Sequence, residues 1–266
     1  MQVFTARWCH LLLLACLVAV FSAVTAAQEQ TLLRVQGSTT LLPAVQRLAQ
    51  SYVGNHRDVK FDVRGGGSGS GIQSLLNAST DITTSSRFLL PGELAAATER
   101  GLYPVPFQIA YDAIIPVVHT SNSLRDLSLD DLARIFRGEI RNWQALGGPD
   151  KAIHLVLRDR ESGTLQVWQE RVAGEPSPDA RVTRVDSSSA VVREVGDHRG
   201  AIGYIGLAGL SAAVKPLRVD GVIGSLGNVR AGRYALARPL FLFTDGWPEG
   251  ASLSFIQFVQ DLSLIH

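Results

Sequence analysis

Three stretches of the chain share one pattern, in which an apolar strand leads through a loop of small polar residues into an amphipathic helix. In the first stretch, LLRVQ at 32–36 fits a strand and GSTTLLP at 37–43 fits the loop. The residues that follow predict a helix because apolar side chains recur at helical spacing, at Leu42, Val45, Ala49 and Tyr52.

The second and third stretches repeat this order with different loops. VKFDV at 59–63 alternates apolar and polar residues, as a half-buried strand does, and the glycine-rich loop RGGGSGSG follows at 64–71. HLVL at 154–157 is a short apolar strand that ends in RDRESGT at 158–164, and the helix LQVWQERV follows at 165–172. Strands that alternate with helices in this way predict an α/β fold.

Loops of this kind favour anion binding. The first N–H groups of a helix have no intrahelical partner and lie at the positive end of its dipole. Glycines allow the backbone to curl around an anion, and Ser or Thr hydroxyls donate hydrogen bonds without carrying charge. Arg158 adds a planar guanidinium that matches two oxygens of a tetrahedral oxyanion.

Each loop also has a purely structural interpretation. Ser38, Thr39 and Thr40 are good helix caps, the glycine tract at 64–71 resembles a flexible linker, and Arg158 alone fits a surface arginine. Three such loops in one chain favour a shared binding site over three coincidences.

Composition and charge limit the classes of partner. The chain has 266 residues, is 46% hydrophobic and 18% charged, and so can bury one large or two medium cores. Residues 1–27 contain the basic Arg7, the apolar run LLLLACLVAVF and then small residues, which is typical of a secretory signal cleaved near Ala26 or Ala27. Without that segment the chain is nearly neutral, which argues against nucleic acid as a partner.

Both cysteines, Cys9 and Cys16, lie inside this signal segment, so we expect no disulfide in the secreted chain. Cys16 follows Leu-Leu-Ala, which resembles a lipobox, but the apolar run continues well past it. We therefore expect a periplasmic or secreted protein, and lipid attachment at Cys16 is the less favoured alternative.

Nucleotide-binding and catalytic motifs are missing from the three loops. Gly71 is followed by isoleucine and not by the lysine of a Walker loop, and the dinucleotide glycine pattern also fails. No Gly-x-Ser-x-Gly elbow surrounds Ser68, Ser70 or Ser162. The histidines outside residues 1–27 show no metal-ligand spacing, so we expect no metal, no cofactor and no enzymatic activity.

Several segments together resemble the phosphate-binding proteins of bacterial high-affinity phosphate ABC transporters (Pst-type). The resemblance runs in order from about residue 32 to residue 260, and the pairing of GSTT with R-x-x-x-SGT is specific. The matching segments are GSTTLLP at 37–43, GGGSGSGI at 65–72, DITTSSR at 81–87, AYDAI at 110–114, IFRGEIRNW at 135–143, R-x-x-x-SGT at 158–164, AIGYIGL at 201–207 and RPLFLFT at 238–244.

This resemblance implies a two-lobed periplasmic binding protein of type II, with the ligand cleft between the lobes. Residues 28–112 would form the first part of lobe I, residues 113–204 lobe II, and residues 205–266 the return segment of lobe I. The two chain crossings would form a hinge that closes on the ligand. Within lobe II, Ser128 is expected to cap a helix formed by LDDLARIF.

The same resemblance implies which residues bind phosphate. The first loop and the glycine-rich loop would supply hydroxyl donors, and the loop at 158–164 would supply the arginine and the start of a helix. The expected set is Ser38, Thr39, Thr40, Ser68, Ser86, Arg87, Asp112, Arg158, Ser162, Gly163 and Thr164.

Two departures from the family's pattern concern acidic groups. Some members place an aspartate near Ser86 that accepts the proton of phosphate; here the nearest substitute is Asp112, which fits the role of an arginine partner equally well. Arg160 stands where the family usually has an acidic residue that pairs with the binding arginine. That change would leave Arg158 without a partner in its own loop and make the site more positive.

We therefore expect a monomeric, non-enzymatic receptor that binds inorganic phosphate and hands it to ABC transporter permease subunits in the inner membrane. Three alternatives stay open: a receptor for sulfate, molybdate or tungstate, an orphan phosphate-binding sensor or adhesion protein, and a phosphatase of similar fold.

Overall fold

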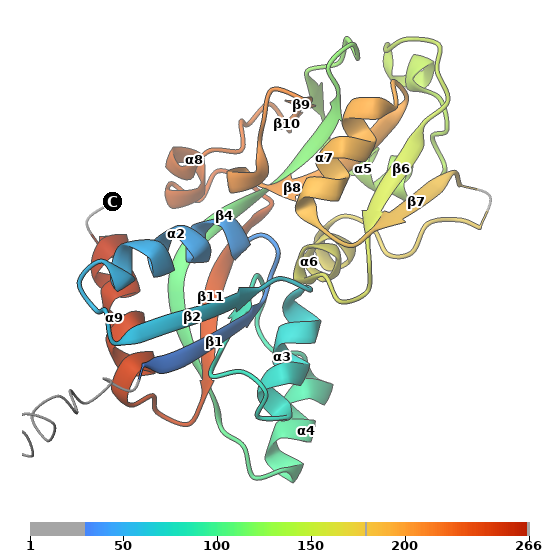
Figure 1. Ribbon diagram of the computed structural model, residues 1–266. Helices are drawn as coiled ribbons and strands as arrows, with labels where there is room; N and C mark the ends of the chain where they lie inside the picture. Colours follow the sequence, from blue (N-terminus) through green and yellow to red (C-terminus); the bar gives the residue numbers. More distant parts are fainter. Residues whose placement is uncertain (1–29, 179, 265–266) are drawn as a thin grey trace, which may run out of the picture.

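One long strand, β4 (Pro104–His119), passes through two hydrophobic cores and joins the two lobes of the molecule (Figure 1). The computed structural model describes residues 30–178 and 180–264. The first half of β4 pairs antiparallel with β11 (Ala237–Asp245), and its second half pairs antiparallel with β8 (Ala201–Gly206). The sheet is therefore continuous between the lobes.

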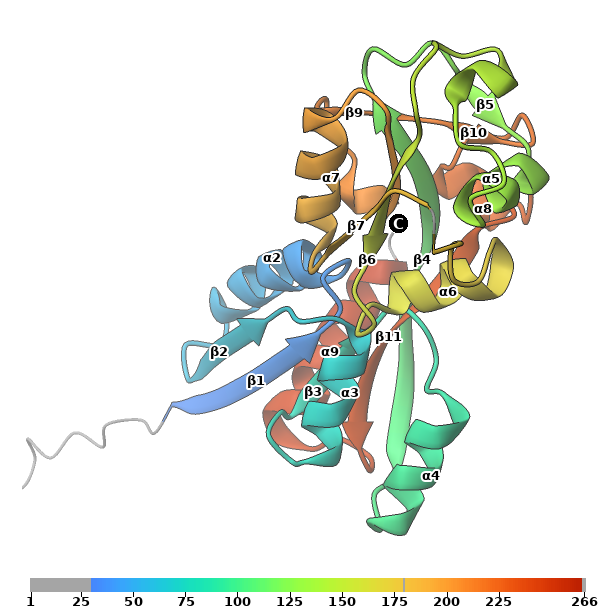
Figure 2. The same cartoon turned by 90° about the vertical axis from the view of Figure 1, so that its right-hand side faces the viewer.

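Lobe I packs helices on both faces of its part of the sheet. Its elements are β1 (Thr31–Gly37), α2 (Leu42–Val53), β2 (Val59–Arg64), α3 (Ser68–Leu76), β3 (Ile82–Ser85), α4 (Pro91–Glu99), the first half of β4, β11, and α9 (Gly250–Leu264). On one face, α2 and α9 bury Tyr52 and Phe255; on the other, α3 and α4 bury Ile72 and Ala97 (Figure 2).

Lobe II surrounds the second core. Its elements are β5 (Asp126–Leu127), α5 (Leu129–Phe136), η1 (Trp143–Leu146), β6 (His154–Arg158), α6 (Gly163–Arg171), β7 (Val182–Val185), α7 (Ser188–Asp197), β8, η2 (Leu207–Gly209), β9 (Val214–Pro216), β10 (Arg218–Val219) and α8 (Leu226–Arg230). Trp168 of α6 stacks on Tyr204 of β8 with ring centroids 4.3 Å apart, and Phe136 of α5 lies 4.7 Å from Trp168. This aromatic group anchors α6 to the sheet.

The order of the strands explains where the loops gather. Within the described residues the sheet runs β2-β1-β3-β11-β4-β8-β6-β7, and β9 pairs with β4 on the edge opposite to β8. β1 is parallel to both β2 and β3, and β6 is parallel to both β7 and β8. Parallel strands end at a common edge, so each lobe presents a set of strand carboxyl ends together with the helix starts that follow them. This α/β arrangement confirms the fold expected from the sequence.

Serine caps fix where several lobe II helices begin. The Ser128 hydroxyl accepts the backbone N–H of Asp131 at 3.0 Å, which confirms the predicted start of α5. Ser162 and Ser187 cap α6 and α7 in the same way. Local sequence therefore positions the first turns of α6 and α7 directly after strands β6 and β7.

The chain returns to lobe I later than residue 205, where the sequence analysis places the crossing. Leu217, Val229 and Leu236 are buried in the lobe II core, and β9 pairs with the lobe II half of β4. The return to lobe I occurs at Ala237, where β11 begins. AIGYIGL thus contains a core strand of lobe II and is followed by further lobe II structure. The chain stays in lobe II because β9 pairs with the edge of β4 that β8 leaves open.

The signal segment expected at residues 1–27, with Cys9 and Cys16, lies outside the described residues. Among the helices of the described ranges, none combines the length and the apolar character that crossing a membrane requires.

Removing the Phe255 ring should destabilise the protein strongly. Phe255 is fully buried, with its ring centroid 4.8 Å from that of Phe61 and 5.4 Å from that of Tyr52. We expect Phe255→Ala to lower the free energy of unfolding by about 3–5 kcal/mol in urea denaturation, because the cavity cannot fully collapse. Leu94→Ala removes a side chain that is 49% exposed and should cost less than about 0.5 kcal/mol. Similar losses for both variants would contradict this packing.

Candidate anion-binding site

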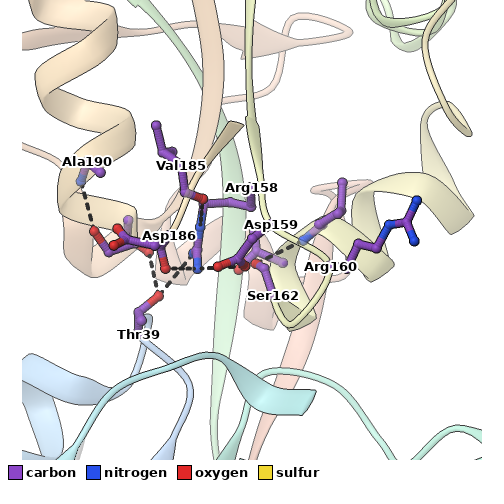
Figure 3. Close-up of polar contacts among 12 residues, drawn as sticks. Thr39, Arg158, Asp159, Arg160, Ser162, Val185, Asp186 and Ala190 are labelled. Atoms are coloured by element: carbon purple, nitrogen blue, oxygen red, sulfur yellow. Dashed lines mark hydrogen bonds and ion pairs between the residues drawn. The ribbon is translucent and has the colours of Figure 1, made fainter. Parts of the chain in front are cut away.

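The carboxyl ends of strands from both lobes meet where the lobes touch. In lobe I, β1 and β3 are parallel neighbours that end at Gly37 and Ser85, so the loops after them lie close together. In lobe II, β6 ends at Arg158, whose loop faces the loop after β1 across the junction (Figure 3). A cleft of about 430 Å³ adjoins this region, and residues of both lobes line it, among them Thr39 and Ser188.

Arg158 is only 1% exposed and bridges the two lobes. Its Nη1 donates to Thr39 Oγ1 of lobe I at 3.0 Å, while Nη2 donates to the backbone oxygen of Asp186 at 2.7 Å (Figure 3). Burial lowers the pKa of this guanidinium, and the carboxylate of Asp159, whose Oδ1 lies 3.6 Å from Nη2, opposes that effect. Arg158 therefore supplies a fixed positive charge at the junction.

The acidic neighbour of Arg158 is Asp159. Arg160 is exposed, and its side chain points away from Arg158 (Figure 3). The expectation that Arg160 leaves Arg158 without an acidic group in its own loop is therefore wrong, because the adjacent residue takes that place. Burial raises the pKa of Asp159, and the positive charge of Arg158 works against this rise.

A second buried arginine, Arg238, forms an ion pair with Asp112. The two residues are opposite each other on β11 and β4, where both strands pass between the lobes. Asp112 Oδ2 accepts from Arg238 Nε at 3.0 Å and from Nη2 at 2.8 Å, and Oδ1 accepts the Leu207 N–H at 2.9 Å. Arg238 is 1% exposed; this burial lowers its pKa, and the Asp112 charge raises it again. Asp112 is thus the partner of Arg238, and its oxygens do not contact Arg87 or Arg158 in any described hydrogen bond or ion pair.

Arg238 lies in a segment that resembles the family's motif, but the resemblance does not mark this arginine as a site residue. One signal was available, since Arg238 opens the strongly apolar run RPLFLFT. A charged residue in such a run is rarely buried without a partner. The partner itself, Asp112, lies far away along the chain, and only the β4–β11 pairing reveals it.

Arg238 also orients one threonine from each lobe. Its Nη2 donates to Thr40 Oγ1 at 3.2 Å and its Nη1 donates to Thr164 Oγ1 at 3.0 Å, and the two hydroxyl oxygens lie 3.2 Å apart. A hydroxyl that accepts a hydrogen bond from an arginine keeps its own proton free to donate. In their own contact one of the two hydroxyls donates to the other, so the pair has one proton left for a further acceptor.

The starts of α3 and α6 touch each other beside these threonines. Ser68 Oγ lies 3.3 Å from Ser86 Oγ and accepts the Ser86 N–H at 3.1 Å. A Cβ at Gly163 would lie 2.4 Å from Ser68 Oγ, so only glycine fits at the first position of α6. Ser162 Oγ caps the helix by accepting the Leu165 N–H at 3.2 Å. The first N–H groups of α6 thus open toward the hydroxyls of lobe I.

The capping interpretation of the first loop does not describe this structure. α2 has Leu41 at its N-cap and no side-chain cap hydrogen bond. Ser38 Oγ instead accepts the Thr40 N–H at 3.3 Å, and the Thr39 hydroxyl contacts Arg158. The first loop therefore directs its hydroxyls toward the junction and not toward its own helix.

The glycine-rich loop is a tight bend and not a flexible linker. Gly67 has φ +101°, a conformation that L side chains rarely adopt, and α3 begins at the next residue. A Cβ at Gly67 would lie 2.4 Å from the backbone oxygen of Glu161 in lobe II, and Gly69 N–H donates to that same oxygen at 2.9 Å. The bend brings the backbone of lobe I into direct contact with lobe II.

Arg87 is the expected site residue that the structure separates from the others. Its guanidinium forms a two-pronged ion pair with Glu93, with Nη2 2.6 Å from Oε1 and Nη1 2.7 Å from Oε2. Arg87 also donates to Gln166 of α6 and to the backbone oxygen of Phe88. Its charge is therefore neutralised within lobe I, although the side chain still links the two lobes.

Together these residues form a site suited to a tetrahedral oxyanion. Hydroxyls of Thr39, Thr40 and Thr164 lie next to two buried guanidinium groups, Arg158 and Arg238. The buried serines and the start of α6 add uncharged donors. Among the described residues of this cluster, no nucleophile is paired with a base.

Comparison with known proteins gives consistent matches over almost the whole chain. A PBP superfamily domain matches residues 23–261. The phosphate-binding protein PstS of Bacillus subtilis (strain 168) is 30% identical over 229 residues, which cover 86% of this chain and 75% of that protein.

Solved structures agree with this match. An X-ray structure from Clostridium perfringens with bound phosphate, assigned to a phosphate ABC transporter substrate-binding protein, is 30% identical and superposes with a TM-score of 0.78 over 86% of this chain and 93% of that one. An ABC-type phosphate transport receptor from Vibrio cholerae is 25% identical, with a TM-score of 0.69 over 88% of this chain and 97% of that one.

Breaking the Arg238 ion pair from one side should destabilise the protein. In Arg238→Met, the buried Asp112 carboxylate loses its cation, and we expect the free energy of unfolding to fall by about 3–5 kcal/mol in urea denaturation. Arg134→Met breaks an exposed pair with Asp131 and should cost less than about 1 kcal/mol. The double variant Arg238→Met/Asp112→Asn should recover part of the loss, because it removes the unpaired charge. If Arg238→Met costs no more than Arg134→Met, the pair is not important for stability.

Proposed function

Since this chain belongs to the PBP superfamily, and within it to the family of the phosphate-binding proteins PstS, we propose that it binds inorganic phosphate between its lobes and delivers it to an ABC transporter. Members of this family are solute-binding receptors and not enzymes, so the phosphatase alternative is set aside. The observation that carries the proposal is the meeting of two buried arginines with hydroxyls of both lobes.

Phosphate would be held by donors from both sides of the junction. Arg158 would neutralise its charge, and the first N–H groups of α6, at Gly163 and Thr164, would point at its oxygens. From lobe I, the hydroxyls of Thr39, Thr40 and Ser68 would donate to the remaining oxygens, with Ser38 and Ser86 supporting the loops that carry them. Donors from both lobes on one ligand make its binding depend on lobe closure.

The hinge for this closure would lie where β4 and β11 cross between the lobes. On β4, Ile109 belongs to the lobe I core and Ala113 to the lobe II core, so a few residues separate two packed bodies. Bending of two neighbouring strands at this level would open the junction while each core stays intact. We infer that the closed, phosphate-bearing form is the one that contacts the permease, and that the receptor acts outside the cytoplasm as a monomer.

For Asp112 we propose a positioning role and not direct contact with phosphate. One of its oxygens already accepts two N–H groups of Arg238, and the other accepts the Leu207 N–H. The carboxylate fixes Arg238, which in turn orients Thr40 and Thr164. A receptor for sulfate, molybdate or tungstate is the second candidate. A carboxylate beside the ligand would repel an anion that has no proton to donate. In the described hydrogen bonds, no carboxylate contacts the hydroxyls of the site.

Replacing Arg158 should abolish tight phosphate binding. Arg158→Ala removes charge-assisted hydrogen bonds of about 1.5–3 kcal/mol each, so phosphate affinity should fall by at least about a hundredfold in isothermal titration. Arg160→Ala is the matched control. It removes the same charge two residues along the chain, from a side chain that points away from the site, and it should bind phosphate like the wild type. Circular dichroism should confirm that both variants are folded. Unchanged phosphate affinity in folded Arg158→Ala would refute the site.

Neutralising Asp112 should weaken phosphate and sulfate alike. If Asp112 acts through Arg238, then Asp112→Asn loosens Arg238 and both threonines, and the affinities for the two anions should fall by a similar factor, on the order of tenfold. Competition titrations of wild type and variant with phosphate and sulfate measure the two factors. A loss for phosphate alone, with sulfate binding unchanged or stronger, would instead show that Asp112 accepts the phosphate proton.

A further inference from the structure

A cluster of potential metal ligands lies in lobe II, at the end of β6 opposite to the anion site. His154 begins β6, and Glu194 and His198 lie one turn apart near the end of α7. One ligand atom from each of these three residues lies within 4.8 Å of the others. Arg158 is four residues further along β6, which places the cluster on the order of 13 Å from the anion site.

His154 carries the observation that makes this cluster more than a chance grouping. Its side chain is buried, at 6% exposure, and its Nε2 lies 2.7 Å from Thr183 Oγ1. Its Nδ1 is buried and has no hydrogen-bond partner among the described residues. A buried polar atom without a partner is costly and rare, so a group that binds Nδ1 is expected here.

His198 presents the matching nitrogen. Its Nδ1 lies 3.0 Å from the backbone oxygen of Glu194 and 3.3 Å from the carboxylate oxygen Oε1 of the same residue. Both oxygens can only accept, so Nδ1 is the donor, and Nε2 is the nitrogen that a neutral ring would offer to a metal. The rings of His154 and His198 meet edge to face with centroids 5.3 Å apart. Each histidine thus has one nitrogen held by an oxygen and the other available, which is how metal-binding histidines are oriented in proteins.

We propose that His154, Glu194 and His198 bind one divalent transition-metal ion, with Zn²⁺ the ion that fits their chemistry best. Two imidazole nitrogens and one carboxylate form a common zinc ligand set, completed by water. Ligand atoms about 2.0–2.1 Å from zinc lie roughly 3.3 Å from each other, so atoms that are now as much as 4.8 Å apart would approach by up to about 1.5 Å when zinc binds. His198 is exposed and Glu194 is half-buried, and their 3.3 Å contact with each other would rearrange in this movement.

The charges around the cluster have both signs. Burial lowers the pKa of His154, Arg181 and His198 add to this effect, and Glu194 opposes it. Arg181 is exposed and opposes a cation, while the Glu194 carboxylate attracts one. Bound zinc would join the start of β6 to the end of α7 and stabilise lobe II by mass action.

Zinc titration of the untagged, purified protein in phosphate-free buffer tests the proposal. The wild type should take up one equivalent of Zn²⁺ in isothermal titration, and its melting temperature should rise with zinc. His198→Gln and Glu194→Gln should each lower zinc affinity by at least about tenfold, which is the smallest effect expected for losing a ligand. Co²⁺ should give the visible absorption of a low-coordinate site in the wild type and lose it in His198→Gln, whereas Mg²⁺ should not bind.

His119→Gln is the matched control, because His119 lies in lobe II outside the cluster and bonds to Ser121. It should bind zinc like the wild type. The proposal is overturned if the wild type takes up no zinc, or if folded His198→Gln binds zinc as tightly as His119→Gln does. Phosphate titration of the same variants should be unchanged, so a failure of the zinc site and a failure of the phosphate site give different results.

Discussion

The ion pair between Arg238 and Asp112 controls how the two lobes meet. Both residues are buried, and they are opposite each other on the two strands that run from one lobe into the other. A buried guanidinium needs hydrogen-bond acceptors; two N–H groups of Arg238 donate to Asp112, one donates to Thr40 of lobe I and one to Thr164 of lobe II. One cation thus contacts donors from both lobes, at the level where the chain crosses between them.

Charge at the junction is balanced by partners of different kinds. Arg238 is paired with a carboxylate, whereas Arg158 is held mainly by the backbone oxygens of Val185 and Asp186, with Asp159 at a longer distance of 3.6 Å. Backbone oxygens orient a guanidinium without cancelling its charge. Arg158 is therefore the cation best able to neutralise an anion, and the uncharged hydroxyls can donate to that anion without adding a charge of their own.

Lobe II uses the two ends of its elements for different chemistry. The carboxyl end of β6 and the start of α7 face lobe I, where Thr39 Oγ1 lies 3.5 Å from Ser188 Oγ. The opposite ends of the same strand and helix bring together His154 and His198. β6 and α7 each run from the histidine cluster to the proposed anion site. An ion bound at the cluster would therefore stiffen both elements without contacting the anion site.

The sequence by itself determined the local units of this protein. Apolar periodicity predicted the strands and helices around the three loops, and Ser128 marked the start of α5, because these features depend on residues within a few positions of each other. Only the tertiary structure decided the partners of the buried charges and the lobe boundary at Ala237. Arg238 meets Asp112, and His154 meets His198, across pairings between segments far apart in the chain, and such pairings depend on the packing of the whole sheet, which no local pattern encodes.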